Sequence, residues 1–464
     1  MGHISRRTFV TGSLATVAMG LCACASQQRN SQSAAITSAS TNTDGQPASI
    51  DFSPSTIPVV YLHIDEQTGP TIEQMDQSED HGVACVGAMD LVVPNGFDAG
   101  YGGKQQESLS NLELEYIRGR GNSTWNRPKN PYKLKFAKKQ SLFGMAEAKP
   151  WVLLANYFDN SLVRNRLAFW AGAELGMAFT PQCVPVDVVM NERYLGSYLL
   201  CEQVGIGKGR VEIPELTPNE VTEPQMSGGY LLALCPERDE AEVSMFSTSG
   251  GVWLYNREPS FDPQGGGSED YVCNQQRDYI RSYVQAAEDA ILGKGDAPYS
   301  DYIDVQSFAD YWLLQMASRN TDAFVTSSNY LYKDRGGKLC WGPLWDFDLA
   351  WNRDSFEPVG TKGWDQNSLL WYERLLADSA FLGVVKGRIT TLAQILAQAI
   401  AGGGTIDRYR QQMETSWQYD HSLYGSYDDG EKGRHIDDLD KEMNLLRAWI
   451  DERMEWMLSA VDSM

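Results

Sequence analysis

The sequence predicts an α+β fold, with a β-rich first part followed by a mainly helical second part. Short runs that alternate apolar with polar residues, rich in β-branched and aromatic side chains, recur between residues 56 and 204. From residue 277 onward, apolar residues recur at helical spacing in longer segments. The length of 464 residues suffices for two or three lobes with a sizeable core. We therefore expect one lobe at residues 56–204 and a second at residues 205–464.

The first 55 residues have the composition of a targeting segment and a linker. Ser5-Arg-Arg-Thr-Phe-Val10 resembles a twin-arginine export signal, and Leu21-Cys-Ala-Cys24 resembles a bacterial lipoprotein cleavage box with Cys24 as the lipidated residue. Residues 1–24 are thus the expected signal, and residues 25–55, rich in Ser, Thr and Gln, the expected flexible tether. We expect an exported protein, held by its lipid alone on the outer face of the bacterial cell membrane.

The charge is strongly acidic overall but contains a basic island. A formal net charge of −22 makes general affinity for nucleic acid or for an anionic membrane surface improbable. Between Tyr116 and Ala146 there is no acidic residue, and the basic residues there are Arg118, Arg120, Arg127, Lys129, Lys133, Lys135, Lys138 and Lys139. This pattern favours a small anionic ligand, and the alternative is a strand with a solvated basic face.

The elements of the first lobe follow from alternation and turn residues. Strands are expected at residues 56–66, 82–93, 112–118, 130–139 and 149–158, followed by a helix at Leu162–Met177. A hairpin comes next, with strands at 184–190 and 194–204 around the turn Asn191-Glu-Arg193, and a Gly-rich break follows at residues 205–209.

Within this lobe, a glycine loop connects the strands expected at residues 112–118 and 130–139. The loop contains Gly119-Arg-Gly121-Asn-Ser-Thr124, and on the second strand Lys133 and Lys135 alternate with apolar residues. Glycines let backbone N–H groups approach an anion, and lysine supplies a positive charge, so the pattern is typical of a β-ribbon folded over phosphates. Glycine in a hairpin turn also has ordinary structural reasons, and the loop is not a P-loop sequence.

In the second lobe we expect strands at residues 228–237, 328–334 and 339–344, and a polar stretch of loops and short strands at residues 238–277. Acidic residues lie close to the later two strands. Asp322 lies on an irregular stretch after a helix, Asn329 opens a strand, and Asp346 and Asp348 follow the next strand. Such oxygens are suitable ligands for a divalent cation, and phosphoryl transfer needs one carboxylate beside the acceptor hydroxyl and another on the metal. Each acid taken alone is more simply a solvated or turn-capping residue.

The helices of the second lobe are expected at residues 277–293, 304–319, 370–377, 380–400, 405–419 and 435–462. Six cysteines lie beyond the leader without any C-x-x-C pair, which argues against a zinc site and favours buried free thiols.

The order of these parts is that of a protein kinase: a β-lobe with a glycine loop and lysines, a hairpin that ends at a hinge, then a helical lobe with Asp, Asn and Asp. The kinase signatures differ, because no G-x-G-x-x-G-x-V and no His-Arg-Asp triplet is present, and Asp346-Phe-Asp348 replaces Asp-Phe-Gly. Four strings resemble the spore-coat CotH kinase family over roughly residues 56–462. They are Arg118-Gly-Arg-Gly-Asn-Ser-Thr-Trp125, Gly196-Ser-Tyr-Leu-Leu-Cys-Glu-Gln203, Ser328-Asn-Tyr-Leu-Tyr-Lys333 and Trp345-Asp-Phe-Asp348.

The resemblance implies a two-lobe, protein-kinase-like fold and an atypical kinase that phosphorylates serine in proteins with ATP and Mg²⁺ or Mn²⁺. By matching position, Asp322 is implied as catalytic and Asn329 and Asp346 as metal ligands. Asp348, two residues on and on the same face of an extended backbone, is expected as a second acidic metal ligand. The implied phosphate-binding and nucleotide-binding residues are Arg118, Arg120, Asn122, Ser123, Lys129, Lys133, Lys135 and Glu202. Lys129, Lys133 and Lys135 compete for one role, and Pro131 as the start of the strand favours the latter two. The implied partners are ATP and a protein substrate, with the chain itself as one candidate.

The alternative is a non-catalytic, pseudokinase-like surface lipoprotein that binds cell-wall or host glycans or a protein partner. The 13 tryptophans and 22 tyrosines would suit stacking on sugars, although most of them are expected in the core. Glycoside hydrolysis by a carboxylate pair and triad hydrolysis fit less well, since no pattern beyond the number of acids supports the first and no nucleophile elbow supports the second.

Overall fold

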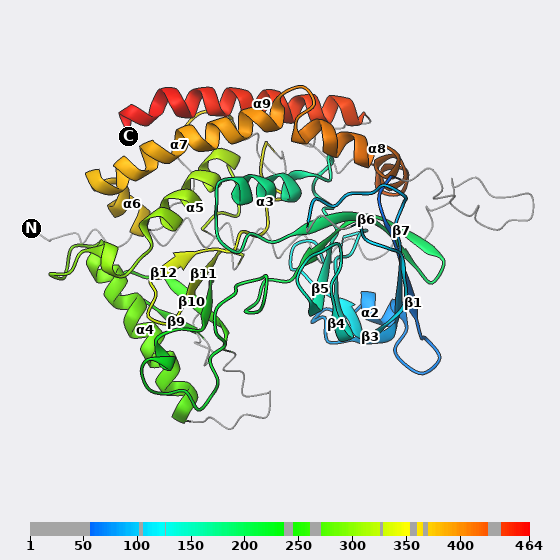
Figure 1. The fold of residues 1–464 in the computed structure, drawn as a ribbon, viewed down its shortest axis with the longest axis horizontal. Coiled ribbons are helices and arrows are strands. Elements are labelled where there is room, and N and C mark those ends of the chain that lie inside the picture. Colours follow the sequence, from blue (N-terminus) through cyan, green and yellow to red (C-terminus); the bar gives the residue numbers. More distant parts are fainter. Residues whose placement is uncertain are drawn as a thin grey trace, which may run out of the picture. The chain divides into compact units, whose positions relative to one another are not determined.

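The first sheet is a closed barrel in strand order β1-β2-β3-β4-β5-β7-β6 (Figure 1). The computed structural model describes residues 56–464 except 102–104, 126, 236–244, 260–270, 325–327, 353–359, 365–369 and 426–437. The barrel strands are β1 (Val59–Ile64), β2 (Ala84–Val92), β3 (Leu109–Gly119), β4 (Tyr132–Gln140), β5 (Ala148–Leu154), β6 (Cys183–Met190) and β7 (Arg193–Glu202). Neighbouring strands are antiparallel except β1 and β6, whose parallel pairing of Val59 with Asp187 closes the barrel.

Alternation places the side chains of the barrel as predicted. On β4, Tyr132, Leu134 and Phe136 are buried, whereas Lys133 and Lys135 between them are half-buried on the opposite face. β4 begins at Tyr132, directly after Pro131, so Lys129 lies before the strand. The short helix α2 (Ile72–Asp76) lies between β1 and β2, capped by Thr71 and Gln74.

The second part contains a sheet that the prediction of a mainly helical lobe includes only in part. Its strand order is β12-β11-β8-β10-β9, formed by β8 (Tyr230–Leu234), β9 (Met245–Ser247), β10 (Trp253–Glu258), β11 (Tyr330–Lys333) and β12 (Leu339–Trp341). The strands near residues 230, 330 and 340 are confirmed, but β9 and β10 were expected only as part of a polar stretch of loops and short strands. The reason is that β9 has only three residues and that β10 ends in the polar residues Asn256-Arg-Glu258, so neither shows a clear strand pattern in the sequence.

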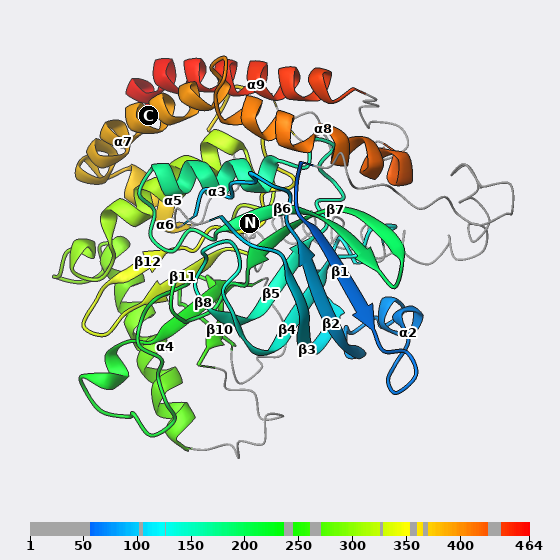
Figure 2. The same cartoon turned by 45° about the vertical axis from the view of Figure 1, so that its right-hand side comes forward.

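Most of the helices lie along one side of the two sheets, whereas α4 lies beside the second sheet (Figures 1 and 2). They are α3 (Arg164–Glu174), α4 (Tyr271–Ile291), α5 (Val305–Ser318), α6 (Leu370–Leu376), α7 (Ser379–Ile400), α8 (Thr405–Tyr424) and α9 (Leu439–Ala460), with 3₁₀ turns at Gln225–Ser227, Tyr299–Asp301 and Val461–Ser463. Asp304, Asp378 and Asp438 cap α5, α7 and α9, which explains why these helices begin close to their predicted starts. Within the described residues, α7 alone is long and apolar enough to cross a membrane. Its buried residues lie among exposed ones, and it packs against α5 and α9.

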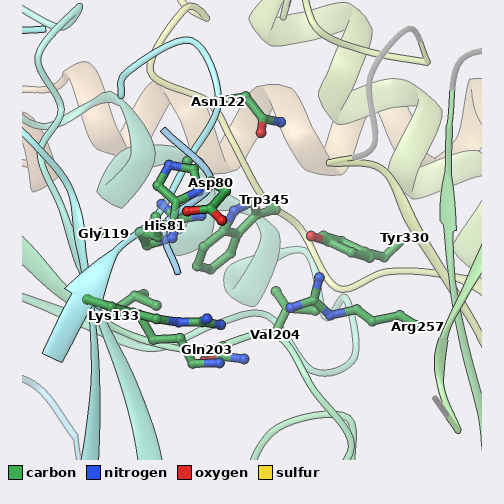
Figure 3. A pocket seen from close by; sticks show the side chains of 14 residues that line it. Asp80, His81, Gly119, Asn122, Lys133, Gln203, Val204, Arg257, Tyr330 and Trp345 are labelled. Carbon is green, nitrogen blue, oxygen red and sulfur yellow. The ribbon is translucent and has the colours of Figure 1, made fainter. Parts of the chain in front are cut away.

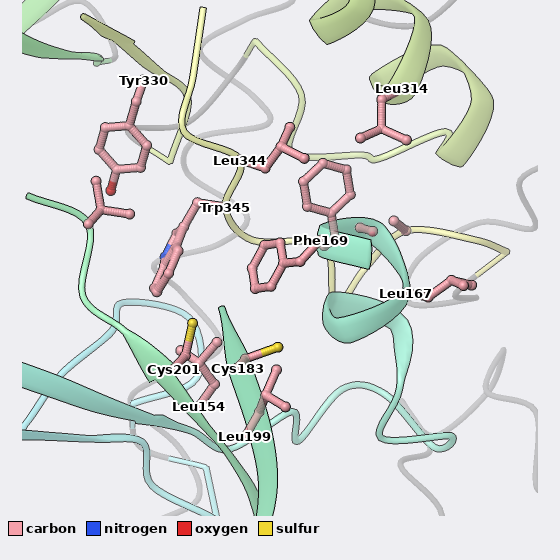
Figure 4. Close-up of a cluster of buried hydrophobic side chains, with 14 of the residues drawn as sticks. Leu154, Leu167, Phe169, Cys183, Leu199, Cys201, Leu314, Tyr330, Leu344 and Trp345 are labelled. Atoms are coloured by element: carbon pink, nitrogen blue, oxygen red, sulfur yellow. The ribbon is translucent and has the colours of Figure 1, made fainter. Parts of the chain in front are cut away.

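A single apolar core joins the barrel to the helices (Figure 4). The stacked rings of Phe169 on α3 and Trp345, 6.0 Å apart, lie between barrel residues such as Leu199 and helix residues such as Leu314. Residues from Pro54 to Met464 form one compact unit, and the α+β class is confirmed. The closed barrel is not an obvious kinase-like lobe, so the two-lobe kinase arrangement and its boundary at residue 204 stay predictions.

The cysteines that the structure describes are free thiols, as predicted. Cys85, Cys183 and Cys201 are buried, and Cys235 and Cys340 are partly buried. Burial raises the pKa of the Cys183 thiol to about 12, which keeps it protonated and unreactive. Cys24 and the whole of residues 1–55 lie outside the described residues.

Candidate active site

A polar cavity of about 290 Å³ opens beside the glycine loop (Figure 3). One wall comes from the barrel and the segments around it, and the other comes from the second sheet and the segment that follows it. The barrel wall is formed by Asp80, His81, Arg118, Gly119, Arg120, Gly121, Asn122, Lys133, Val152, Gln203 and Val204. The opposite wall is formed by Arg257 on β10, Tyr330 on β11 and Trp345. The cavity therefore brings together residues far apart in the sequence.

The backbone of the glycine loop is held close to a buried tryptophan. A Cβ atom on Gly119 would lie 2.1 Å from the ring of Trp125, so only glycine fits there. The indole N–H of Trp125 donates to the carbonyl oxygen of Ser78 at 3.0 Å, which anchors the ring. Gly121 has φ +93°, a conformation that side chains rarely adopt. These constraints explain why glycines 119 and 121 and Trp125 occur together in one string.

Four cations face the cavity: Arg118, Arg120, Lys133 and Arg257. Among the residues that the structure describes, none of them forms an ion pair with an acid. Burial, followed by the charges of Arg118 and Arg257, lowers the pKa of Lys133 to about 8. Burial also lowers the pKa of Arg120, against the opposing charge of Asp346. Four cations against one acid in the lining, Asp80, leave an excess of positive charge, and such a cavity is suited to bind an anion.

Other predicted anion-binding residues lie elsewhere. Lys129 is buried outside the cavity, and its ammonium group donates to the carboxylate of Asp420 and to the carbonyl oxygen of Ser197 at 2.5 Å. Lys135 is on the outer surface, where its ammonium lies 2.5 Å from Glu115. These contacts give both lysines a partner within the fold, whereas Lys133 lines the cavity.

Two further predicted residues lie at the margin of the cavity. Ser123 is exposed and does not line it. Glu202 is buried, and its carboxylate accepts the backbone N–H of Gln182 at 3.0 Å. The residues after Glu202, Gln203 and Val204, do line the cavity.

The predicted acids lie close enough to influence one another's charge. Burial and the neighbouring charge of Asp346 raise the pKa of Asp322 to about 7. Asp348 is buried, and its pKa is raised well above the usual range by burial, then by Asp346 and Asp322. Asp346 has φ +68°, a strained backbone for a residue other than glycine. Asp322, Asp346 and Asp348 therefore form one acid segment, and through Asp346 this segment influences Arg120 in the cavity.

Neighbouring side chains hold this acid segment in place. On α3, Asn165 accepts the backbone N–H of Phe347 at 2.7 Å, and the guanidinium of Arg164 donates to the carbonyl oxygen of Ala350 at 3.0 Å. The amide of Asn320 donates to the backbone carbonyl of Asp346 at 3.1 Å. The positions of the acids thus depend on α3 as much as on their own strands.

Asn329 has a different environment from that of an open metal ligand. Its carbonyl oxygen accepts the hydroxyl of Tyr311 at 2.9 Å and the N–H of Phe324 at 3.2 Å, and its amide donates to the carbonyl oxygen of Asp322 at 3.2 Å. Asn329 therefore holds the loop that carries Asp322. To ligate a metal it would have to give up one of these bonds.

The fit of a divalent cation to the acid segment is partial. In the described part of the chain, no three His, Cys, Asp or Glu side chains form a group that could hold a metal ion. One carboxylate oxygen of Asp346 accepts the hydroxyl of Ser328 at 2.7 Å. Magnesium, however, needs few protein oxygens because water and phosphate supply the others, and a cation would relieve the mutual repulsion of Asp346 and Asp348. Asp346 and Asp348 are thus chemically suited to be its ligands.

Sequence reasoning missed several residues of the cavity. His81 and Arg257 lie outside every motif, one in a loop before β2 and the other on a strand within the polar stretch 238–277. Tyr330 lies within the string Ser328-Asn-Tyr-Leu-Tyr-Lys333, but the string does not predict that its side chain lines the cavity. The basic island could not reveal Arg257, because that residue reaches the cavity from the second sheet.

A comparison with models of protein families gives one match for this chain. The model of the family described as CotH kinase protein matches residues 117–457, which include the glycine loop, the acid segment and all of the residues lining the cavity except Asp80 and His81. A search of the curated proteins finds no match. Family membership indicates a kinase-like function and the use of ATP. Over most of its length, from the end of β3 to α9, this chain belongs to the CotH kinase protein family.

Proposed function

We propose that the chain is an atypical, metal-dependent protein kinase that transfers the γ-phosphate of ATP to serine hydroxyls of an envelope or secreted protein. One observation carries this proposal. A cavity lined by cations that have no acidic partner among the described residues adjoins the acid segment that contains Asp322. Phosphoryl transfer needs positive charge around the phosphates and a carboxylate beside the acceptor hydroxyl.

Each side chain has a separate part in the proposed reaction. Arg118, Arg120 and Lys133 bind the phosphate oxygens and stabilise the charge that develops on them. Asp322 orients the serine hydroxyl and accepts its proton, for which a pKa near neutrality is suited. Asn122 lies at the loop end of the cavity, and the base of the nucleotide lies along Gln203 and Val204.

Asp346 and Asp348 would hold the Mg²⁺ or Mn²⁺ ion, whose charge, when it is bound, offsets the negative charge of the phosphates. Asn329 acts first as a positioning residue for the Asp322 loop, because both of its polar atoms are bonded there.

The alternative function is a non-catalytic protein that binds a nucleotide or a partner without transferring phosphate. The specific observation in its favour is that Asn329 and Asp346 already accept hydrogen bonds from Tyr311 and Ser328. Asp-Phe-Asp in place of Asp-Phe-Gly points the same way. The two functions share the cavity and differ only in the acid segment.

We also propose that the protein is exported and anchored by a lipid on Cys24. The support is the leader, with its arginine pair and lipoprotein-like box. Membrane fractions of cells that express the full chain should contain it, and Cys24→Ser should release it. A Cys24→Ser protein that stays in the membrane would contradict the anchor.

The activity is tested with purified protein, ATP and Mn²⁺ or Mg²⁺, with phosphoserine on the protein itself detected by mass spectrometry. We expect phosphate transfer by the native chain and a loss of about 10²–10⁴-fold for Asp322→Ala, with nucleotide binding retained. Binding without transfer in the native chain would favour the non-catalytic alternative. Transfer that survives in Asp322→Ala would remove Asp322 from the reaction.

A further inference from the structure

Arg257 differs from the other cavity cations in its origin. Arg118, Arg120 and Lys133 all come from the end of β3, its loop and β4, whereas Arg257 belongs to β10 in the second sheet. In Figure 3, Arg257 and Lys133 extend into the cavity from opposite sides. The cavity therefore has a positive charge on each of two walls that belong to different sheets.

The guanidinium of Arg257 has no acid partner among the residues that the structure describes. The adjacent carboxylate, Glu258, accepts the backbone N–H of Ile206 at 2.9 Å instead. Arg257 lies over the ring of Tyr330, 5.7 Å from its centroid, which orients the guanidinium without neutralising it. Tyr330 pairs through β11 with β8, the strand between β11 and β10, so the orientation is built into the sheet.

Placing Arg257 here has an electrostatic cost. Its charge and that of Arg118 both help to lower the pKa of Lys133 across the cavity. Like charges that face each other without an intervening anion destabilise the fold, and a bound anion removes this repulsion. Positive charge on both walls is therefore expected when the ligand carries negative charge that reaches both Lys133 and Arg257.

We propose that Arg257 binds the phosphate chain of the ligand from the second sheet, so that one polyphosphate bridges the barrel wall and the β10 wall. This inference rests on the proposed function for the identity of the ligand as a nucleoside triphosphate. It also defines the ligand class more narrowly. Arg257 increases the affinity for ligands with a chain of phosphates and contributes little to the affinity for a nucleoside monophosphate. Bridging ties the two sheets together, so ligand binding stabilises them as one unit.

The test measures the dissociation constants of a non-hydrolysable ATP analogue, ADP and AMP for the native chain and Arg257→Met. A charge-assisted hydrogen bond contributes about 1.5–3 kcal/mol, so we expect the analogue to bind about 10- to 150-fold more weakly to Arg257→Met, with a much smaller change for AMP. Arg281→Met, which removes an exposed arginine of α4, is the matched control and should bind as the native chain does.

Arg257→Lys should recover part of the affinity, since it restores the charge without the forked geometry. Equal loss for the analogue and AMP would overturn the inference, because it would indicate a general disturbance of the site. Unchanged binding of the analogue would overturn it directly.

Inorganic tripolyphosphate separates this inference from the proposed function, because its binding needs the cations but no base or catalysis. Stabilisation of the native chain by tripolyphosphate, lost in Arg257→Met but not in Arg281→Met, supports the bridge even if no nucleotide binds. Tripolyphosphate that stabilises the two variants equally contradicts the bridge, whatever the kinase assay gives.

Discussion

Two sets of cations in this chain, one buried and one half-buried around the cavity, have opposite surroundings. Lys129 and Arg164 are fully buried and have partners: Lys129 bonds Asp420 and Ser197, and Arg164 bonds Asp159 and, at 2.8 Å, Glu442. The cavity cations Arg118, Arg120, Lys133 and Arg257 have no acid partner among the described residues. The first set joins elements of the fold, since Lys129 links the barrel to α8 and Arg164 links α3 to α9.

This difference distinguishes cations that stabilise the fold from cations that can bind a ligand. A buried cation whose donors are all used within the protein stabilises the structure and has no bonding capacity left for a ligand. A cation held in a cavity without a counter-charge costs stability until an anion arrives. Lys129 of the first set and Lys133 of the second lie four residues apart in the same basic stretch, so the sequence pattern alone does not distinguish them.

The largest effect is expected where a paired cation is removed. Arg164→Met would leave Asp159 and Glu442 buried without their partner, and we expect the free energy of unfolding to fall by about 3–5 kcal/mol. Urea denaturation measures this. Arg410→Met, which breaks an exposed pair with Asp440 on the surface, is the control and should cost less than about 1 kcal/mol. Similar costs for the two variants would remove the distinction between the sets.

A smaller effect is expected from pH at the cavity. The pKa of Lys133 is lowered to about 8, so the side chain loses its proton as the pH rises through 8, and a bound phosphate favours the protonated form. Affinity for the ATP analogue should be greatest below pH 8 and should fall about tenfold between pH 7 and pH 9. Titration calorimetry at both pH values measures it. Lys133→Arg keeps its charge, so its affinity should stay level, and an equal fall in that variant would exclude Lys133 as the titrating group.

The smallest effect is expected at the neighbouring surface lysine. Lys135 faces outward against Glu115, so Lys135→Ala should change the affinity for the ATP analogue by less than about threefold. Its effect on stability should also be below about 1 kcal/mol. A loss as large as that of a cavity lysine would show that β4 presents both lysines to the ligand.

The sequence predicted the local structure well because local patterns determine it. Alternation on β4 and the capping aspartates of α5 and α7 are short-range features, and the expected elements lie close to the observed ones. Barrel closure was not predicted, because it depends on β1 pairing with β6 across more than a hundred residues. The strands β9 and β10 were missed for a local reason, because β9 has only three residues and β10 ends in polar residues.

The sequence predicted only those residues of the candidate site that lie within recognisable motifs. Arg118, Arg120, Asn122 and Lys133 lie together as their string implied, and Asp322 and Asp346 lie close enough to raise a pKa. Lys129 was grouped with the lysines of β4, although its partner Asp420 is almost three hundred residues away in sequence. Arg257 was missed because it contributes to the cavity from another sheet.

The most direct test of the account compares Lys133→Met with the native chain in two measurements, affinity for a non-hydrolysable ATP analogue and thermal stability without ligand. Removing an unpaired cavity cation should weaken binding at least about tenfold and leave the melting temperature unchanged or higher, because burial and repulsion from Arg118 and Arg257 are relieved. Native affinity in Lys133→Met, or a melting temperature that falls as it does in Arg164→Met, would contradict the claim that the unpaired cations form the phosphate site.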